Sequence, residues 1–217
     1  MGAEKERRLL EIRRAIFTMA SVVESRLQRA VEALVRRDRE AAEDVRHGDR
    51  AVDVMEIDVE RMCIETLALQ HPVAGDLRFI LAVLRINGEL ERIADLSKGI
   101  AKRLLRLDLD VLDLPDELGT MALAARDMLT EVLRAFGDSD VERARRVRRD
   151  DLEIDRLRTA VRDWGHGHIV EGDLNPESVV DLLDVARCLE RIGDMCTNVA
   201  EDVVFLVEGR NVRHTEL

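Results

Sequence analysis

The chain has 217 residues, a length that fits one large domain or two small ones. Apolar residues make up 46% of it, enough for a buried core, and charged residues make up 36%, above the roughly 25% of an average globular protein. The formal net charge is −11 and aromatic residues are 2%, with no Tyr. This balance counts against a nucleic-acid-binding protein, which needs basic surface and aromatic stacking platforms.

Nothing in the sequence predicts a membrane span or a secretory leader. The longest apolar run, Phe79 to Leu84, is six residues, against the ~20 needed to cross a bilayer. The N-terminal MGAEKERR lacks an apolar signal core. The three cysteines, Cys63, Cys188 and Cys196, are an odd number without a CxxC pair. We therefore expect buried free thiols in a cytoplasmic protein without membrane insertion.

Apolar residues recur every three or four positions along most of the chain, which predicts an all-α fold. Few glycines and prolines interrupt this pattern, as is typical of long helices. Six long helices are expected, at about 6–36, 38–70, 73–107, 116–136, 139–170 and 176–208. The predicted domains are two tandem three-helix bundles, at 1–107 and 116–208, with a linker at 108–115 and a C-terminal tail at 209–217.

Local signals mark several of these helix ends. His71-Pro72 ends the second helix, because proline cannot continue the preceding hydrogen-bond ladder. Ser139, with Glu142 three residues on, predicts a capping box that opens the fifth helix. Asn175-Pro176 supplies an N-cap followed by proline at the first helical position of the sixth.

The two halves resemble each other in sequence. Residues 38, 42, 45, 49 and 53 match residues whose numbers are 102 higher, as 151 is to 49. The block LERIAD at 90–95 matches LERIGD at 189–194, with a difference of 99. A duplicated three-helix unit explains this pattern better than chance.

The most informative residues are four pairs of carboxylates spaced by four positions, which places both members on one helix face. Counted from the turn of each antiparallel hairpin, the pairs of one half lie at one height. We predict that they form two cation sites. The candidate metal ligands are Asp49, Asp53, Glu91, Asp95, Asp151, Asp155, Glu190 and Asp194.

These acids continue apolar stripes that face a neighbouring helix, so we expect them to be buried or half-buried. Such a cluster must be protonated, paired with arginine or bound to a cation. The plainer interpretation is salt bridging, for which Arg92 and Arg191 are at hand. The alternative is two all-oxygen cation sites, which suit Mg, Ca, Mn or ferric iron better than zinc or copper.

Other motifs give little sign of catalysis. A ferritin-like di-iron centre needs Glu-x-x-His, which the sequence lacks, and a glycosidase needs an aromatic-lined cleft. No Gly-rich phosphate loop, nucleophile elbow or HExxH occurs. A cluster of five arginines at 143–149 is either a solvated helix face with acidic partners or a docking surface.

Two blocks of the sequence resemble the PhoU family of phosphate-uptake regulators. The first runs from Pro72 to Arg78 and continues as LERIAD at 90–95, which is similar to the family pattern PxAxDLR…LERIGD. The second, LERIGD at 189–194 with NVAE at 198–201, is similar to LERIGD…NIAE. Ala94 stands where the family prefers Gly, a change of little expected consequence. Residues 98–101 lack the expected Asn, so the first site is expected to be the weaker one.

The resemblance implies two three-helix bundles side by side, related by a pseudo-twofold axis, and a cytoplasmic regulator that is not an enzyme. It implies contact with the ATPase subunit of the phosphate ABC transporter and with the phosphate-sensing histidine kinase, and restraint of the phosphate-starvation response. It also implies multinuclear metal clusters, of iron before zinc or manganese, on the carboxylate pairs, and a homodimer. A carboxylate-bridged metalloenzyme and a passive helical scaffold stay open as alternatives.

Overall fold

The computed structural model describes residues 2–47, 50–108, 114–172 and 174–212. This part of the chain forms seven helices and contains no strand, which confirms the all-α prediction. None of its helices has a stretch long and apolar enough to span a bilayer. The helices are α1 (Gly2–Val35), α2 (Arg39–His47), α3 (Arg50–Gln70), α4 (Gly75–Leu104), α5 (Asp116–Asp138), α6 (Val141–Glu171) and α7 (Pro176–Glu208).

The single helix expected over 38–70 is described as two helices, α2 and α3. The sequence of α2 suits a helix that ends at His47. Arg46 and His47 lie in its last turn, where basic side chains interact favourably with the backbone carbonyls that have no partner within the helix. His47 Nδ1 lies 2.8 Å from the Glu43 carbonyl oxygen. Residues 48 and 49, between the two helices, lie outside the described residues.

The α5–α6 turn also differs in detail from the expectation. Ser139 adopts left-handed backbone (φ 54°) as the C-cap of α5, so it cannot also open α6. Asp140 is the N-cap instead, and its side chain accepts a hydrogen bond from the Arg143 N–H at 2.9 Å. At α7 the prediction is confirmed: Asn175 accepts from the Glu177 N–H at 2.9 Å, and Pro176 occupies the first helical position.

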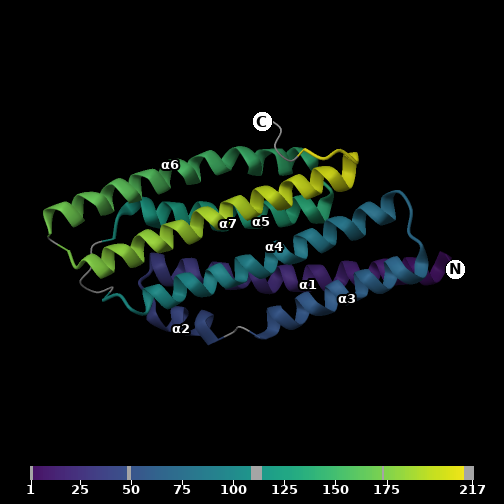
Figure 1. The fold of residues 1–217 in the computed structure, drawn as a ribbon, viewed down its shortest axis with the longest axis horizontal. Helices are drawn as coiled ribbons and strands as arrows, with labels where there is room; N and C mark the ends of the chain where they lie inside the picture. The colour runs from purple at the N-terminus through teal and green to yellow at the C-terminus, as the bar shows by residue number, and fades with distance from the viewer. Residues whose placement is uncertain (1, 48–49, 109–113, 173, 213–217) are drawn as a thin grey trace.

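The helices form two groups that lie side by side along the long axis of the molecule (Figure 1). The first group holds α1, α2, α3 and α4, and the second holds α5, α6 and α7. The groups meet where α4 packs on α7 and α1 packs on α5. One continuous apolar core runs through both. The three cysteines are free and buried in it, as expected.

The duplication is visible in the burial pattern. For ten of the eleven buried residues on α1, the residue 102 positions later is buried on α5. The α1 positions are 16, 19, 20, 23, 26, 27, 30, 31, 33 and 34. The two helices therefore present the same face to their bundles, as the predicted repeat requires.

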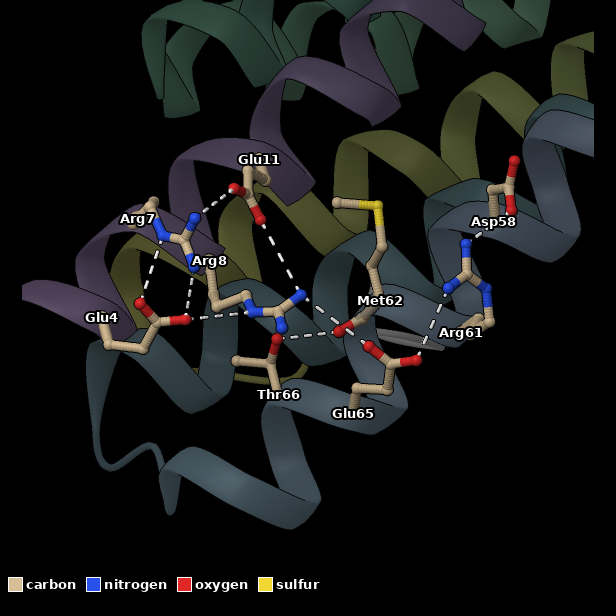
Figure 2. Close-up of polar contacts among 9 residues, drawn as sticks. All are labelled: Glu4, Arg7, Arg8, Glu11, Asp58, Arg61, Met62, Glu65 and Thr66. Carbon is tan, nitrogen blue, oxygen red and sulfur yellow. Dashed lines mark hydrogen bonds and ion pairs between the residues drawn. The ribbon is translucent and has the colours of Figure 1, made fainter. Parts of the chain in front are cut away.

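Salt bridges tie the outer edge of the first bundle together, as Figure 2 shows. Arg8 on α1 lies 3.8 Å from Glu65 on α3, and it also contacts Glu4 and Glu11. Glu65 in turn contacts Arg61 at 3.5 Å. These groups lie at the surface, so they orient α1 and α3 without adding much stability.

Candidate metal centres

The structure describes seven of the eight predicted carboxylates; Asp49 lies outside the described residues. They come from facing helices in each bundle. The first carboxylate set is Asp53 on α3 with Glu91 and Asp95 on α4. The second carboxylate set is Asp151 and Asp155 on α6 with Glu190 and Asp194 on α7.

The second set is brought together as the hairpin geometry predicts. Partial burial and the negative charges of Asp194, Asp155 and Glu190 raise the pKa of Asp151 to about 6. Burial and the charge of Asp155 also raise the pKa of Asp194, although Arg158 and Arg191 partly offset this. The neighbouring charges help to destabilise the ionised forms of Asp151 and Asp194, and a bound cation would relieve that repulsion.

A glycine makes room for one of these acids. A Cβ atom on Gly193 would lie 2.7 Å from Asp151 Oδ1, closer than real contacts allow. The α7 helix thus leaves a hollow that the Asp151 carboxylate fills. The first bundle carries Ala94 at the corresponding position.

The first set contains an acid that sequence reasoning also missed. Burial, together with the charges of Asp95, Glu56 and Asp53, raises the pKa of Glu91. Burial and the charges of Glu60, Asp53 and Asp95 raise the pKa of Glu56 as well. The signal was present in the sequence, because Glu56 follows Asp53 by one helical turn.

The acids are less buried than expected. Asp53, Asp95, Asp155 and Asp194 are exposed, and Glu91, Asp151 and Glu190 are half-buried. They lie beside the apolar stripe of their helices, which stays buried alongside them at Ile93 on α4 and Ile192 on α7. The salt-bridge interpretation applies in part: Arg158 lies 3.3 Å from Glu190.

The donor chemistry fits a hard cation, but the ligand sphere is not assembled. Carboxylate oxygens are what Mg²⁺, Mn²⁺ and ferric iron prefer. Within the described residues, however, no group of three or more His, Cys, Asp or Glu side chains is placed so that it could hold a metal ion. The carboxylates of each set would have to change rotamer before they could bind one metal ion together.

Comparison with known proteins decides the family. The PhoU domain model matches the chain twice, over residues 16–104 and 118–203. The chain belongs to the PhoU family. It is 33% identical to the phosphate-specific transport system accessory protein PhoU of Serratia marcescens over 95% of this chain and 85% of the relative. Identity to the protein of the same name from Escherichia coli K12 is 31%, over 95% and 86%.

Solved PhoU structures share the fold. The phosphate transport system regulatory protein PhoU from Streptococcus pneumoniae superposes with a TM-score of 0.88 at 27% identity, over 96% of this chain and 99% of that one. PhoU from Pseudomonas aeruginosa gives a TM-score of 0.90 at 29% identity, over 94% and 99%.

Some PhoU signature residues join the two bundles. Asn198, whose counterpart is missing from the first repeat, donates a hydrogen bond to Glu89 Oε1 across α4 and α7 at 3.3 Å. At the equivalent place on the other side, a Cβ on Gly99 would lie 3.8 Å from Cys188 Sγ. Arg78 of the first signature donates to the Leu206 carbonyl at 3.3 Å. The Asn that the first repeat lacks thus contacts the other bundle in the second repeat, while the expected weakness of the first metal site stays a prediction.

The arginine cluster at 143–149 is largely paired within this PhoU chain. Arg145 contacts Glu142 and Glu208, and Arg148 lies 3.4 Å from Glu201. Arg143 contacts three acids near the α5–α6 turn. These pairs favour the interpretation of the cluster as a helix face with acidic partners.

Proposed function

We propose that this protein is a regulatory accessory protein of phosphate transport. The observation that carries the proposal is the match of the PhoU model to both halves of the chain. Relatives whose names describe phosphate-specific transport accessory proteins support it, because their similarity covers 95% of this chain.

Within this role, the protein acts as an adaptor. It contacts the ATPase subunit of the phosphate ABC transporter and the phosphate-sensing histidine kinase, and it restrains the phosphate-starvation response in the cytoplasm as a homodimer. The charged helix faces and the lack of a catalytic motif in the sequence support signalling by contact.

The adaptor responds to a metal ion held by its carboxylates. Asp53, Glu91 and Asp95, with Asp49, would hold it in the first bundle. The second set, Asp151, Asp155, Glu190 and Asp194, would do so in the second. Such an ion, with iron ahead of zinc or manganese, supplies positive charge that screens the acids and draws facing helices together. The raised pKa of Asp151, caused by burial together with repulsion from the neighbouring acids, supports this role.

A carboxylate-bridged metalloenzyme is the alternative, and it needs a substrate cavity beside the acids. A cavity of about 590 Å³ lies between the residues that follow α4 and the first turns of α7. The predicted carboxylates that the structure describes do not line it. A passive scaffold is the remaining alternative. It predicts that neutralising the acids alters stability but no protein contact.

The test combines binding with a cellular readout. We would measure binding of the intact protein to the transporter ATPase and to the cytoplasmic part of the histidine kinase from the same genome. A reporter of phosphate starvation would be followed in cells lacking the protein. The proposal expects binding to both partners and a reporter that the wild-type gene silences when phosphate is plentiful. Failure to bind either partner, with an unchanged reporter, would reject it.

A matched pair of variants separates the metal from the adaptor role. Asp151→Asn with Asp194→Asn neutralises the second set, whereas Asp127→Asn with Asp163→Asn removes two exposed surface acids. A responsive adaptor loses reporter control only with the first pair. Equal behaviour of both pairs would leave an adaptor without metal control.

A further inference from the structure

One buried position distinguishes the two bundles. Of the ten matched buried positions on α1 and α5, nine are apolar in both helices and one is not. The exception is Arg26, which is 8% exposed and stands where the second bundle has Met128, 3% exposed. A buried arginine on an apolar face is costly unless charges and hydrogen bonds compensate it.

Arg26 finds that compensation at the first carboxylate set. Its Nη2 donates a hydrogen bond of 3.1 Å to the Val45 carbonyl oxygen, which fixes the guanidinium against α2. The negative charges of Asp95 and Asp53 act on it. Arg26 is buried whereas Asp53 and Asp95 are exposed, so its charge lies on the core side of these acids, where water screens it least.

A second cation accompanies it. Lys98, half-buried and one turn beyond Asp95, lies within reach of the charge on Arg26. The repeat places Thr197 at the corresponding position of the second bundle. The Thr197 Oγ1 is buried and has no hydrogen-bond partner among the described residues.

The opposite exchange occurs on the outer side. Glu56 in the first bundle corresponds to Arg158 in the second, which pairs with Glu190 at 3.3 Å. The Arg158 side chain is 45% exposed, so water and salt screen its charge. The main difference between the two sets is therefore the position of the accompanying arginine. Arg26 is buried beside the first set, whereas Arg158 is exposed beside the second.

We propose that Arg26 is a built-in counterion of the first carboxylate set, so that a divalent cation binds at the second set and is excluded from the first. This inference rests on the proposed metal response. It adds that the two repeats are unequal, with one set closed by the chain itself and the other open. An arginine on the inner side of the carboxylates repels an incoming metal ion, whereas Met128 does not.

The first experiment exchanges the two residues. Mn²⁺ binding to the intact, chelator-treated protein would be measured by loss of the free-ion electron paramagnetic resonance signal. The wild-type protein is expected to bind Mn²⁺. The double variant Asp151→Asn with Asp194→Asn is expected to lose this binding, and the double variant Asp53→Asn with Asp95→Asn is expected to keep it. Arg26→Met is expected to add a site that depends on Asp53 and Asp95.

The reverse exchange and a control complete this series. Met128→Arg is expected to weaken the wild-type site by at least about tenfold, because the added cation repels the metal. Arg29→Met, which removes a half-exposed arginine one turn along α1, is expected to change neither site. The inference would be overturned if Mn²⁺ binding to the wild-type protein depended on Asp53 and Asp95. It would also be overturned if Arg26→Met gained no Mn²⁺ binding at the first carboxylate set.

A metal-free measurement keeps the inference testable if Mn²⁺ does not bind at all. In the presence of chelator, Arg26→Met is expected to lower the urea midpoint, since the acids lose their counterion. Adding Asp95→Asn is expected to recover part of that loss. Additive effects of the two changes would show that Arg26 does not compensate these acids. A failed Mn²⁺ experiment with clear coupling would instead reject the metal response and keep the counterion.

Discussion

Arg85 on α4 and Asp202 on α7 form an ion pair of 3.0 Å between the two bundles. The repeat maps this pair onto Asp184 and Arg103, which lie 3.2 Å apart with the helices exchanged. Both arginines belong to α4 and both aspartates to α7. Two identical α4 faces would bring arginine against arginine, so the interface is complementary only because the repeats have diverged in charge.

The Arg85–Asp202 pair predicts unequal costs for its two halves. The Asp202 side chain is 1% exposed and that of Arg85 is 38% exposed. Arg85→Met takes a partner from a buried carboxylate, and we expect it to lower the free energy of unfolding by about 1–3 kcal/mol. Asp202→Asn leaves an arginine that can turn to water, at an expected cost of about 1 kcal/mol or less. Urea unfolding followed by circular dichroism measures both, and equal losses would contradict the burial argument.

Asp151 predicts how stability depends on pH in chelator. Its pKa is raised in the folded state, from an ordinary 3.8 to about 6. The folded protein therefore holds this proton over a range in which the unfolded chain has lost it, so stability falls as pH rises from about 4 to about 6. Asp151→Asn is expected to flatten that decline and to be the more stable protein at pH 7. The same slope in both proteins would show that Asp151 does not titrate in this range.

Gly193 predicts a defect confined to the second carboxylate set. In Gly193→Ala the new Cβ meets the end of the flexible Asp151 side chain, which can move aside. We expect the free energy of unfolding to change by less than about 1 kcal/mol, because the higher helix propensity of alanine offsets the crowding. The affinity for Mn²⁺ is expected to fall. Gly88→Ala is the control: a Cβ there meets nothing within 4 Å, so a gain of about 0.5–1 kcal/mol and unaltered Mn²⁺ binding are expected.

The surface network of Figure 2 predicts a small effect. Arg8→Met removes the contacts to Glu4, Glu11 and Glu65, all at the surface. Exposed ion pairs contribute about 0–1 kcal/mol, so we expect a loss of less than about 1 kcal/mol that shrinks in high salt. A larger loss, unaffected by salt, would mean that the arginine stem packs between α1 and α3.

Much of this molecule follows from the sequence itself. The helical class, the duplication and the grouping of the second carboxylate set depend on periodicity and on spacing from a turn. Both are properties of one helix or one hairpin, so they can be read along the chain. The same reasoning failed at Ser139, where two helix ends compete for one residue and the left-handed cap of α5 prevails.

What only the tertiary structure decided is which residues meet across helices distant in sequence. Arg26 lies 69 positions before Asp95, and no local pattern marks it as the neighbour of that acid. The contact of Asn198 with Glu89 and the room that Gly193 leaves for Asp151 likewise depend on how helices rotate and approach. That rotation is set by the packing of the whole core, because burial is shared among many side chains while each contact is specific to one pair.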